Sequence, residues 1–367
     1  MSSEAPAPPL AALRAQFPVL ERLAYLNAGT NGPLPYEAIA AARVQLGREL
    51  DDGRAGGPHF ERRAQLAEEL RAGYAERIGC TAADLTLTTS TTEGVARVLL
   101  GLDLRPGDEI VTSDEEHPGV LGPLVGQRAR GMEVRVAPWH DVADAVGPRT
   151  RLVVCSHVSW RSGRFAPLDA LRALDVPVLL DGAQGAGAVP VDVDALGAAA
   201  YAAAGQKWLC GPEGTGLLYV SPALRERMRP PAPGYVNLAD PGAGIEAAPW
   251  DDARAYDTPA LPAASFAQAA AALDVLAVAG WDAIHAHAAS LAATATDALT
   301  AAGRTVLARD RTTLVTWREP DAPAAVERLA AAGVIVRAIP GEQLVRASFG
   351  GWNNEDDLDR LLAALPH

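Results

Sequence analysis

Residues 178–220 read VLLDGAQGAGAVPVDVDALGAAAYAAAGQKWLCGPEGTGLLYV, a stretch that alternates short apolar runs with glycine-containing turns. It contains Lys207, the only lysine among the 32 basic residues of this 367-residue chain; all the others are arginines. Arginine stays protonated at any ordinary pH, whereas a lysine amine can lose its proton and attack a carbonyl to form a Schiff base. Lys207 is therefore a candidate nucleophile. The alternative is a chance lysine on a solvated face of an arginine-rich chain.

Asp181 follows the strand-like run Val178–Leu180, and Lys207 follows a second short apolar run. The 26 positions between them (207 − 181) match about one strand–helix–strand step. The loop Gly211–Gly216 then leads into a further strand-like run, Leu217–Val220. This spacing predicts that the carboxylate and the amine lie at the ends of two strands of one sheet.

The same alternation of strands and helices extends from about Arg62 to Val220. Such a pattern implies right-handed crossovers and a mostly parallel sheet covered on both faces. Ligands of such sheets collect beyond the carboxyl ends of the strands. The predicted helices are Glu61–Arg77 and Thr92–Leu102. Leu85–Thr88 is strand-like, and short buried strands are predicted at Glu109–Thr112, Glu133–Val136, Arg151–Cys155 and Pro177–Leu180.

The last third of the chain has a different organisation. Between Pro230 and Pro262 it is rich in Pro, Gly and Asp, which predicts a long irregular connection. Long helices are expected at Ala263–Ala279 and Trp281–Ala302. A smaller α/β unit is expected to follow, with strands at Thr313–Trp317, Val334–Arg337 and Val345–Phe349 and helices at Ala322–Ala332 and Asn354–Leu365.

Composition excludes several classes of function. A net charge of −13 and a pI near 5.0 argue against nucleic acid or an anionic membrane as a partner. The first ten residues, MSSEAPAPPL, contain no secretory signal pattern, and polar residues interrupt the alanine-rich stretches, so we expect a cytoplasmic protein without a membrane span. Cys80, Cys155 and Cys210 are far apart and form no CxxC pair, so no metal site is predicted.

A phosphate-binding turn is suggested by Ser90-Thr91-Thr92-Glu93-Gly94, which lies between a predicted strand and a helix. Hydroxyls and free amides at a helix N-terminus bind phosphate, although Ser or Thr there is more often a simple helix cap. A lone Asp181 would likewise be an ordinary turn residue. In combination, a phosphate cradle, a strand-end acid and a unique lysine are what pyridoxal phosphate requires, for its phosphate, its ring nitrogen and its aldehyde.

With these segments, the chain resembles the class V aminotransferase group of pyridoxal-phosphate enzymes. The resemblance runs from Tyr25-Leu26-Asn27 to Arg346-Ala347-Ser348-Phe349 and is strongest in VLLDGAQGAGAVPVDV, GQKW and GPEGTGLLYV. It implies an α/β protein of fold type I, with a large domain built on a mostly parallel seven-stranded sheet and a smaller C-terminal α/β domain. The implied divisions are residues 1–30 for an N-terminal segment of the small domain and the substrate-entrance loop, 31–260 for the cofactor-binding domain and 261–367 for the small domain.

The resemblance also implies roles for individual residues. Lys207 would hold the cofactor as an aldimine and shuttle protons, Asp181 would pair with the pyridinium nitrogen, and His117 would stack on the ring. For His117 a loop-capping role is the alternative. The other implied cofactor contacts are Thr91, Thr92 and Gln206 at the phosphate and Gln184 and His157 at the phenolic oxygen.

Further implied roles concern the substrate and a second subunit. Arg337 would bind the substrate α-carboxylate, and Asn27 lies in the loop Tyr25–Pro35, which would line the substrate entrance. Thr258 would cross a homodimer interface to the partner's phosphate. Trp160, Arg161, Arg164, Trp250 and Trp352 are candidates for shaping the substrate pocket, with ordinary packing or surface exposure as the alternative.

The chain departs from the family pattern at two places. Most relatives have Ser or Thr and then His where this chain has Ala204 and Gln206, so one hydroxyl is missing at the phosphate. Desulfurases carry a nucleophilic cysteine between the substrate-binding arginine and the Arg-Ala-Ser strand. Here that interval, Ala338–Val345, contains none.

The segments EHPGVL, SHVSWRSG and GQKWLCGPEGTG look most similar to the cystine C–S lyase pattern. The resemblance therefore implies β-elimination from a cysteine derivative, by way of the Lys207 aldimine and a quinonoid and without a persulfide cysteine. The alternatives are an aminotransferase, an amino-acid epimerase, and a desulfurase or selenocysteine lyase. A non-catalytic relative would be expected to lack the lysine or the aspartate, and both are present.

Overall fold

The computed structural model of the chain describes residues 8–366, so seven of the ten residues used for the signal-peptide prediction lie outside it. Its helices are α1 (Pro8–Ala15), α2 (Tyr36–Asp51), α3 (Gly56–Ile78), α4 (Thr91–Gly101), α5 (Pro118–Ala129), α6 (Leu168–Arg172), α7 (Pro222–Arg225), α8 (Ala263–Ala279), α9 (Trp281–Ala301), α10 (Ala322–Ala331) and α11 (Glu355–Ala364). Its strands are β1 (Ala24–Tyr25), β2 (Leu85–Thr88), β3 (Glu109–Ser113), β4 (Glu133–Ala137), β5 (Thr150–Ser156), β6 (Val178–Asp181), β7 (Ala200–Ala204), β8 (Gly216–Val220), β9 (Leu314–Arg318), β10 (Val334–Ile335), β11 (Arg337–Ala338) and β12 (Leu344–Ser348).

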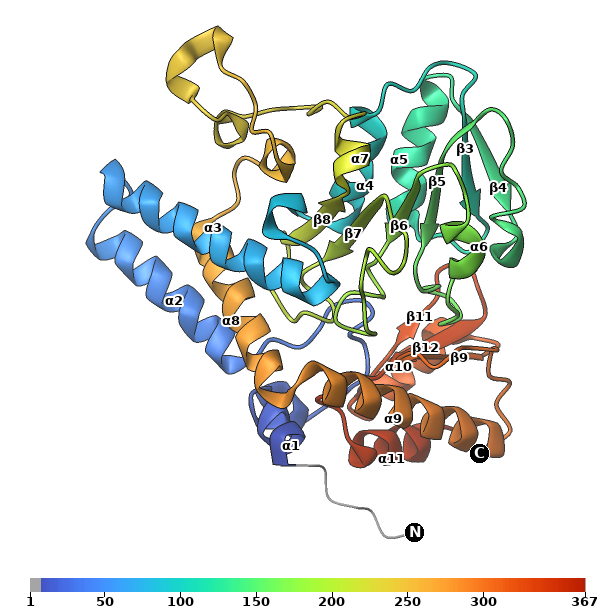
Figure 1. The fold of residues 1–367 in the computed structure, drawn as a ribbon. Helices are drawn as coiled ribbons and strands as arrows, with labels where there is room; N and C mark the ends of the chain where they lie inside the picture. Colours follow the sequence, from blue (N-terminus) through green and yellow to red (C-terminus); the bar gives the residue numbers. More distant parts are fainter. Residues whose placement is uncertain (1–7, 367) are drawn as a thin grey trace.

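The large sheet has seven strands in the order β2-β8-β7-β6-β5-β3-β4. The strands from β7 to β4 pair in parallel, and β8 is antiparallel to both β7 and β2. The predicted mostly parallel sheet is therefore confirmed. Helices lie on both of its faces (Figure 1), as right-handed crossovers require.

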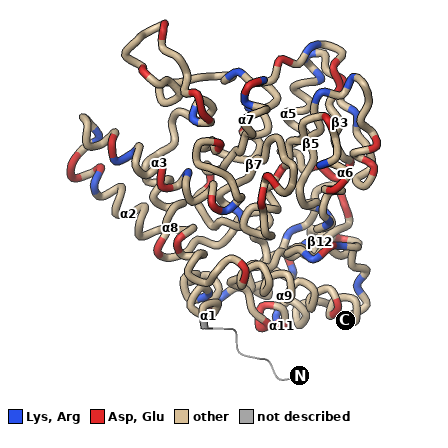
Figure 2. The backbone as a smooth tube through the Cα atoms, in the orientation of Figure 1, with Lys and Arg blue, Asp and Glu red and all other residues tan. Residues whose placement is uncertain are grey.

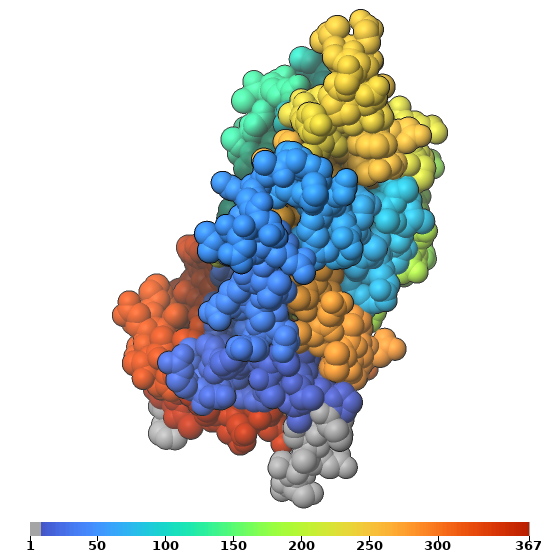
Figure 3. All heavy atoms as spheres, turned by 90° about the vertical axis from the view of Figure 1, so that its left-hand side faces the viewer, coloured from blue at the N-terminus to red at the C-terminus, as the bar shows by residue number. Residues whose placement is uncertain are grey.

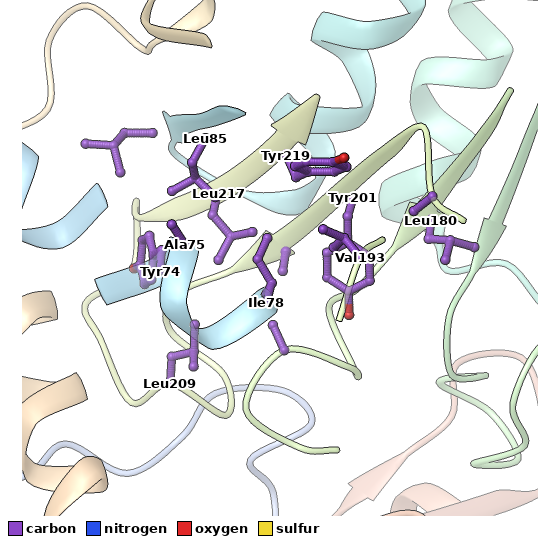
Figure 4. Packing of buried hydrophobic residues seen from close by; sticks show 14 of the residues in the cluster. Tyr74, Ala75, Ile78, Leu85, Leu180, Val193, Tyr201, Leu209, Leu217 and Tyr219 are labelled. Carbon is purple, nitrogen blue, oxygen red and sulfur yellow. The ribbon is translucent and has the colours of Figure 1, made fainter. Parts of the chain in front are cut away.

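Alternate residues of the strands supply two separate apolar layers. Leu217 and Tyr219 of β8 pack under α3 together with Tyr74 and Ile78 (Figure 4). Leu218 of β8 faces the opposite layer, which α4 and α5 cover. Burial on both faces explains why these strands are continuous apolar runs in the sequence.

The prediction of a buried strand was wrong for β4. Only Ala137 of its five residues is buried, because β4 is the edge strand of the sheet and has a single neighbour, β3. Glu133 and Arg149 form a surface ion pair beside it. Charged side chains of this kind are a common way to keep an edge strand from pairing with another chain.

A smaller unit follows the long helices α8 and α9. Its antiparallel sheet has the order β11-β12-β9, and a separate parallel pair joins β1 to β10. The single strand predicted over Val334–Arg337 is therefore wrong: the chain breaks at Val336, and its two halves belong to different sheets. The segment around β1 thus pairs with a strand from the C-terminal part of the chain.

Between Pro230 and Pro262 the chain forms only the short 3-10 helices η4 (Tyr235–Asn237), η5 (Pro241–Glu246) and η6 (Ala253–Tyr256). This segment projects from the body of the molecule near the turn between α2 and α3 (Figure 1). The long irregular connection predicted there is confirmed.

Acidic and basic positions are interspersed along the chain in Figure 2, without a stripe of one sign in that view. Within residues 8–366 no single helix is long and apolar enough to cross a membrane. Only α8 and α9 taken together reach the required length and hydropathy, and they meet at 78°.

Candidate active site

Four of the predicted site residues lie at the carboxyl ends of four neighbouring strands of the large sheet. In the order β7-β6-β5-β3, the residues that end or follow these strands are Lys207, Asp181, His157 and His117. Because these four strands are parallel, their carboxyl ends lie side by side, where ligands of such sheets bind. The structure thus brings together residues that are up to 90 positions apart (207 − 117).

Lys207 and Asp181 lie close enough for the charge of each to shift the pKa of the other. Burial lowers the pKa of Lys207 to about 8, against the opposing effect of Asp181 and with help from the positive charges of Arg346 and Arg337. Burial raises the pKa of the Asp181 carboxyl, and the charge of Lys207 opposes that rise. An amine with a lowered pKa has a larger neutral fraction, and only the neutral form attacks a carbonyl.

His117 is the N-cap of α5, and its Nδ1 accepts a hydrogen bond from Gly119 N at 3.0 Å. The capping role kept as an alternative is therefore observed. It does not compete with ring stacking, because the cap uses only one edge of the imidazole. Burial, with the charges of Lys207 and of the two arginines, lowers the His117 pKa to about 4. The ring is therefore neutral at pH 7.

His157 and Gln184 form a buried polar layer beneath this edge. His157 Nδ1 lies 3.1 Å from the Tyr201 hydroxyl, and burial lowers the His157 pKa to about 4. Gln184 Nε2 donates to Gly29 O at 2.9 Å, and its Oε1 accepts from Trp208 Nε1 at 3.0 Å. One N–H of Gln184 remains for a ligand, and the amide is already fixed in place.

The turn before α4 has the chemistry of an anion site. Ser90 caps the helix by accepting from Glu93 N at 3.1 Å. The neighbouring Thr91 Oγ1 is buried without a partner, and so is Gln206 Oε1. Thr92 is exposed, and its hydroxyl lies so near Gly119 that a Cβ there would come within 2.7 Å of it. Buried polar atoms without partners mark places where a ligand completes the hydrogen bonding.

Thr258 contacts the first turn of the same helix. Its hydroxyl donates to Glu93 Oε2 at 2.7 Å within its own chain, and its backbone N donates to Leu87 O. Its predicted contact with a partner's phosphate remains a prediction.

The N-terminal loop, residues 25–35, packs between the lysine segment and the small unit. Gly32 N donates to Gln206 O at 2.8 Å, and a Cβ on Gly32 would come within 2.1 Å of Lys207 O. Asn27 Oδ1 accepts from Thr30 Oγ1 at 2.8 Å, and Thr30 in turn accepts from Arg337 Nη1 at 3.1 Å. Asn27 and Arg337 are therefore linked through one hydroxyl at this edge.

Arg346 is the main residue that sequence reasoning missed. It is 0% exposed, its Nη1 donates to Trp160 O at 2.7 Å, and its Nε and Nη2 have no partner. It faces Arg337 directly across the β11–β12 pair. Burial, with the charge of Arg337, lowers the Arg346 pKa to about 9. A charged residue inside the Leu344–Ser348 strand was the available signal, because such residues are almost never fully buried without a partner.

The five candidates for the substrate pocket lie in different parts of the molecule. The Trp160 ring stands edge-on to His117, with centroids 4.8 Å apart, and Arg161 and Arg164 follow it in the same loop. Trp250 stacks under Arg254 in the projecting segment, and Trp352 packs against Phe17 in the core. Trp160 is therefore the aromatic residue of this set that borders the site.

Comparisons with known proteins agree with this geometry. A family model described as Aminotransferase class-V matches residues 24–361. The chain belongs to the class-V aminotransferase family. A probable cysteine desulfurase from Methanothermobacter thermautotrophicus is 30% identical over 231 residues, which cover 59% of this chain and 58% of that protein. The isopenicillin N epimerase of Streptomyces clavuligerus is 30% identical over 245 residues, which cover 61% and 60%.

A solved structure is similar to this chain over nearly its whole length. The cystine C–S lyase C-DES, in complex with its reaction product cysteine persulfide, superposes with a TM-score of 0.89 at 28% identity, covering 95% of this chain and 98% of that one. The predicted fold type I is thereby confirmed. The two curated relatives are matched over less than two thirds of their own lengths.

Class-V aminotransferases depend on pyridoxal phosphate, so this chain is an enzyme of that cofactor class. The residues present fit the group. The unpartnered Thr91 hydroxyl and the α4 N-terminus suit a phosphate, and the Asp181 carboxylate suits a protonated ring nitrogen. Gln206 can present its amide N–H groups to the same phosphate after a 180° flip. In residues 8–366 no group of three or more His, Cys, Asp or Glu is arranged to hold a metal ion.

Proposed function

We propose that this class-V enzyme cleaves the C–S bond of a cysteine derivative by β-elimination, giving pyruvate, ammonia and a thiol or persulfide. A likeness to the cystine lyase C-DES over 95% of the chain supports the proposal. The observation that carries it is the turn between β11 and β12. There the chain runs from Ala338 to Leu344 without a cysteine.

The chemistry of the three cysteines supports the same conclusion. Cys155 and Cys210 are fully buried, and burial raises the pKa of each thiol well above its usual value. Burial and nearby carboxylates raise the pKa of Cys80 to about 12. A persulfide-forming nucleophile must be a thiolate, and none of these groups ionises near pH 7. Sulfur therefore leaves with the product and is not transferred to the enzyme.

The substrate would be held by its α-carboxylate. Arg346 Nε and Nη2 are buried donors without a partner, and Arg337 is the register partner of Arg346. Two guanidinium groups can bind a carboxylate with parallel hydrogen bonds. We therefore assign the carboxylate contact to Arg346 together with Arg337, and Asn27 is placed to border the same group.

Lys207 is the residue that moves the proton. When bound, pyridoxal phosphate withdraws electrons from the substrate α-carbon and so acidifies its hydrogen. With the substrate bound, Lys207 Nζ would take that proton, and its lowered pKa of about 8 suits a base near neutral pH. The electron pair of the Cα–H bond then forms a Cα–Cβ double bond as the Cβ–S bond breaks. Sulfur leaves as a thiolate, and water converts the three-carbon remainder to pyruvate and ammonia.

The other cofactor contacts are assigned by position. Asp181 would keep the ring nitrogen protonated, His117 would cover one face of the ring, and Thr91 with Gln206 would hold the phosphate. His157 and Gln184 would border the phenolic oxygen, and Thr92 would add a phosphate contact at the exposed side.

The test uses purified holoenzyme with L-cystine and with S-substituted cysteines. Elimination predicts pyruvate and ammonia in equal amounts without an added keto acid. Aminotransfer would instead require an acceptor keto acid, and epimerisation, which the Streptomyces relative suggests, would change optical rotation without pyruvate. A desulfurase would release alanine. Any of these results in place of pyruvate contradicts the proposal.

We also propose a homodimer. Figure 3 shows the α2–α3 turn and the projecting segment 230–262 on one face. Large apolar side chains are exposed on α2 (Tyr36, Val44, Leu46 and Leu50), near the start of α3 (Phe60) and in the projecting segment (Tyr235 and Ile245). A contiguous patch of exposed apolar side chains is typical of a contact surface, and we infer that these residues form one. In a dimer, Thr258 would lie near the interface. Light scattering that gives twice the mass of 38.2 kDa supports this assembly, and a monomer contradicts it.

A further inference from the structure

The two arginines that face the site share one small hairpin. Arg337 in β11 and Arg346 in β12 are register partners. The hairpin connection, residues 339–343, contains Glu342 and closes with a hydrogen bond from Ile339 N to Leu344 O at 2.9 Å. Whatever holds this hairpin in place therefore fixes both arginines together.

β12 also pairs with β9 within the small unit, and two adjacent residues of the large unit, Trp160 and Arg161, contact the hairpin from outside that sheet. Trp160 packs in an apolar cluster with Ile339 and Leu344, and its carbonyl accepts from Arg346 Nη1 at 2.7 Å. Its ring centroid lies 5.8 Å from the Arg337 guanidinium carbon. Each arginine therefore touches Trp160.

Arg161 supplies the ionic part of this contact. Its Nε lies 2.8 Å from both carboxylate oxygens of Glu342, and its Nη2 lies 2.7 Å from Oε2. On the side of the large unit, its Nη1 lies 3.7 Å from Glu115, a carboxylate that Arg164 and two serines also bind. Arg161 is therefore anchored on one side by Glu115 and holds the hairpin on the other.

We propose that Arg161 is a positioning residue, which acts through Glu342 to hold the β11–β12 hairpin so that Arg337 and Arg346 converge on the substrate carboxylate. The inference rests on the proposed function of the site. Loss of the pair should loosen the hairpin and weaken substrate binding, and proton transfer at Lys207 should continue. The pair is about one third exposed, at 31% and 33%, so its effect is that of a partly solvated ion pair. Measured coupling for such pairs corresponds to about 1.5- to 5-fold in an equilibrium constant.

The test compares wild type with Glu342→Ala and Arg161→Gln. The apparent dissociation constant for glycine is measured on the holoenzyme from the change in near-visible absorbance. Each variant is expected to raise it by about 1.5- to 5-fold, and the double variant should add little to either single one. In turnover, KM should rise by the same factor while kcat stays within twofold.

A control ion pair lies at the amino ends of β4 and β5, away from the carboxyl edge that carries the site. Glu133 and Arg149 form an equally short two-point ion pair, at 2.7 Å and 2.7 Å, beside the edge strand β4. Glu133→Ala removes a similar pair far from the site and should leave glycine binding unchanged. If it weakens binding as much as Glu342→Ala does, the positioning role is overturned.

A second measurement does not depend on the cofactor. Hydrogen exchange of the Ile339 and Glu342 amides, followed by mass spectrometry on the cofactor-free protein, should be faster in both hairpin variants and unchanged in Glu133→Ala. Equal exchange in all four proteins overturns the proposal. If wild-type holoenzyme shows no near-visible band, the proposed function fails, and the exchange experiment still decides whether Arg161 holds the hairpin.

Discussion

The same substitution at two buried arginines of this enzyme should change the free energy of unfolding in opposite directions. Arg346 is 0% exposed, and its Nε and Nη2 have no partner, whereas Arg71 is 2% exposed and fully paired. Arg71 Nη2 lies 2.7 Å from Asp257 Oδ2, and Nη1 donates to Leu85 O and to Asp257 Oδ1. We predict that Arg346→Met stabilises the cofactor-free enzyme and that Arg71→Met destabilises it.

The magnitude for Arg346 follows from its pKa. Burial, together with the charge of Arg337, lowers that pKa from 12.5 to about 9, which at about 1.4 kcal/mol per pH unit means that keeping the charge in this place costs about 5 kcal/mol. Methionine loses the hydrogen bond to Trp160 and leaves that carbonyl unpaired, which costs about 1–3 kcal/mol. The net gain in unfolding free energy is therefore about 2–4 kcal/mol. Arg71→Met instead leaves Asp257 as an unpaired buried charge, at a cost of about 3–5 kcal/mol.

The assay is urea unfolding of both variants and wild type without cofactor, together with glycine titration of the holoenzymes. Arg346→Met should unfold at higher urea and bind glycine at least about 30-fold more weakly, because truncating a buried charge contact costs about 2–5 kcal/mol. Arg71→Met should unfold at lower urea. An Arg346→Met protein that is less stable than wild type, or that binds glycine normally, would refute the assignment of Arg346 Nε and Nη2 as buried donors for the substrate carboxylate.

Three further predictions concern other parts of the site. Thr91→Ala should raise the dissociation constant for pyridoxal phosphate by about 10- to 100-fold, because one hydrogen bond to a charged group is lost; unchanged affinity by equilibrium dialysis would exclude the phosphate role. His117 has a pKa of about 4 in the folded enzyme and 6.5 as a free side chain, so the unfolded state binds more protons between these values and stability falls as pH drops through that window. His117→Gln should therefore reduce the loss of unfolding free energy between pH 6.5 and 4 by about 1–2 kcal/mol in urea titrations, and an unaltered pH profile would show that the imidazole is not desolvated. Gly32→Ala should lower the thermal midpoint and the cofactor affinity, since its Cβ would come within 2.1 Å of Lys207 O. Gly47→Ala should be neutral or stabilising, because the space around Gly47 on α2 is open. Equal behaviour of the two variants would contradict the tight packing of the entrance loop.

The sequence predicted the large sheet well because its central strands are buried on both faces. β5 and β6 contain the buried apolar runs Leu152–Cys155 and Val178–Leu180, and residues that follow such runs, Asp181 and His157 among them, reach the carboxyl edge. The helix α8 was predicted with its observed bounds because a proline precedes it and a glycine follows it.

Local sequence patterns predicted the structure less well where tertiary contacts decide it. No helix was predicted over Tyr36–Asp51, since only Ala38 and Gln45 of α2 are buried and no apolar stripe marks it. The break at Val336 depends on which sheet each half of the run joins, and local propensity does not encode that. The surroundings of Arg346 could not be predicted locally either, because its one hydrogen-bond partner, Trp160 O, lies 186 positions away along the chain.

The central claim is that Lys207 holds pyridoxal phosphate covalently, and borohydride reduction of the holoenzyme tests it most directly. Reduction followed by peptide mass mapping should place the reduced cofactor on the peptide that contains Lys207, and Lys207→Ala should give no adduct while keeping its fold. An adduct elsewhere, or none in wild type, would contradict the account.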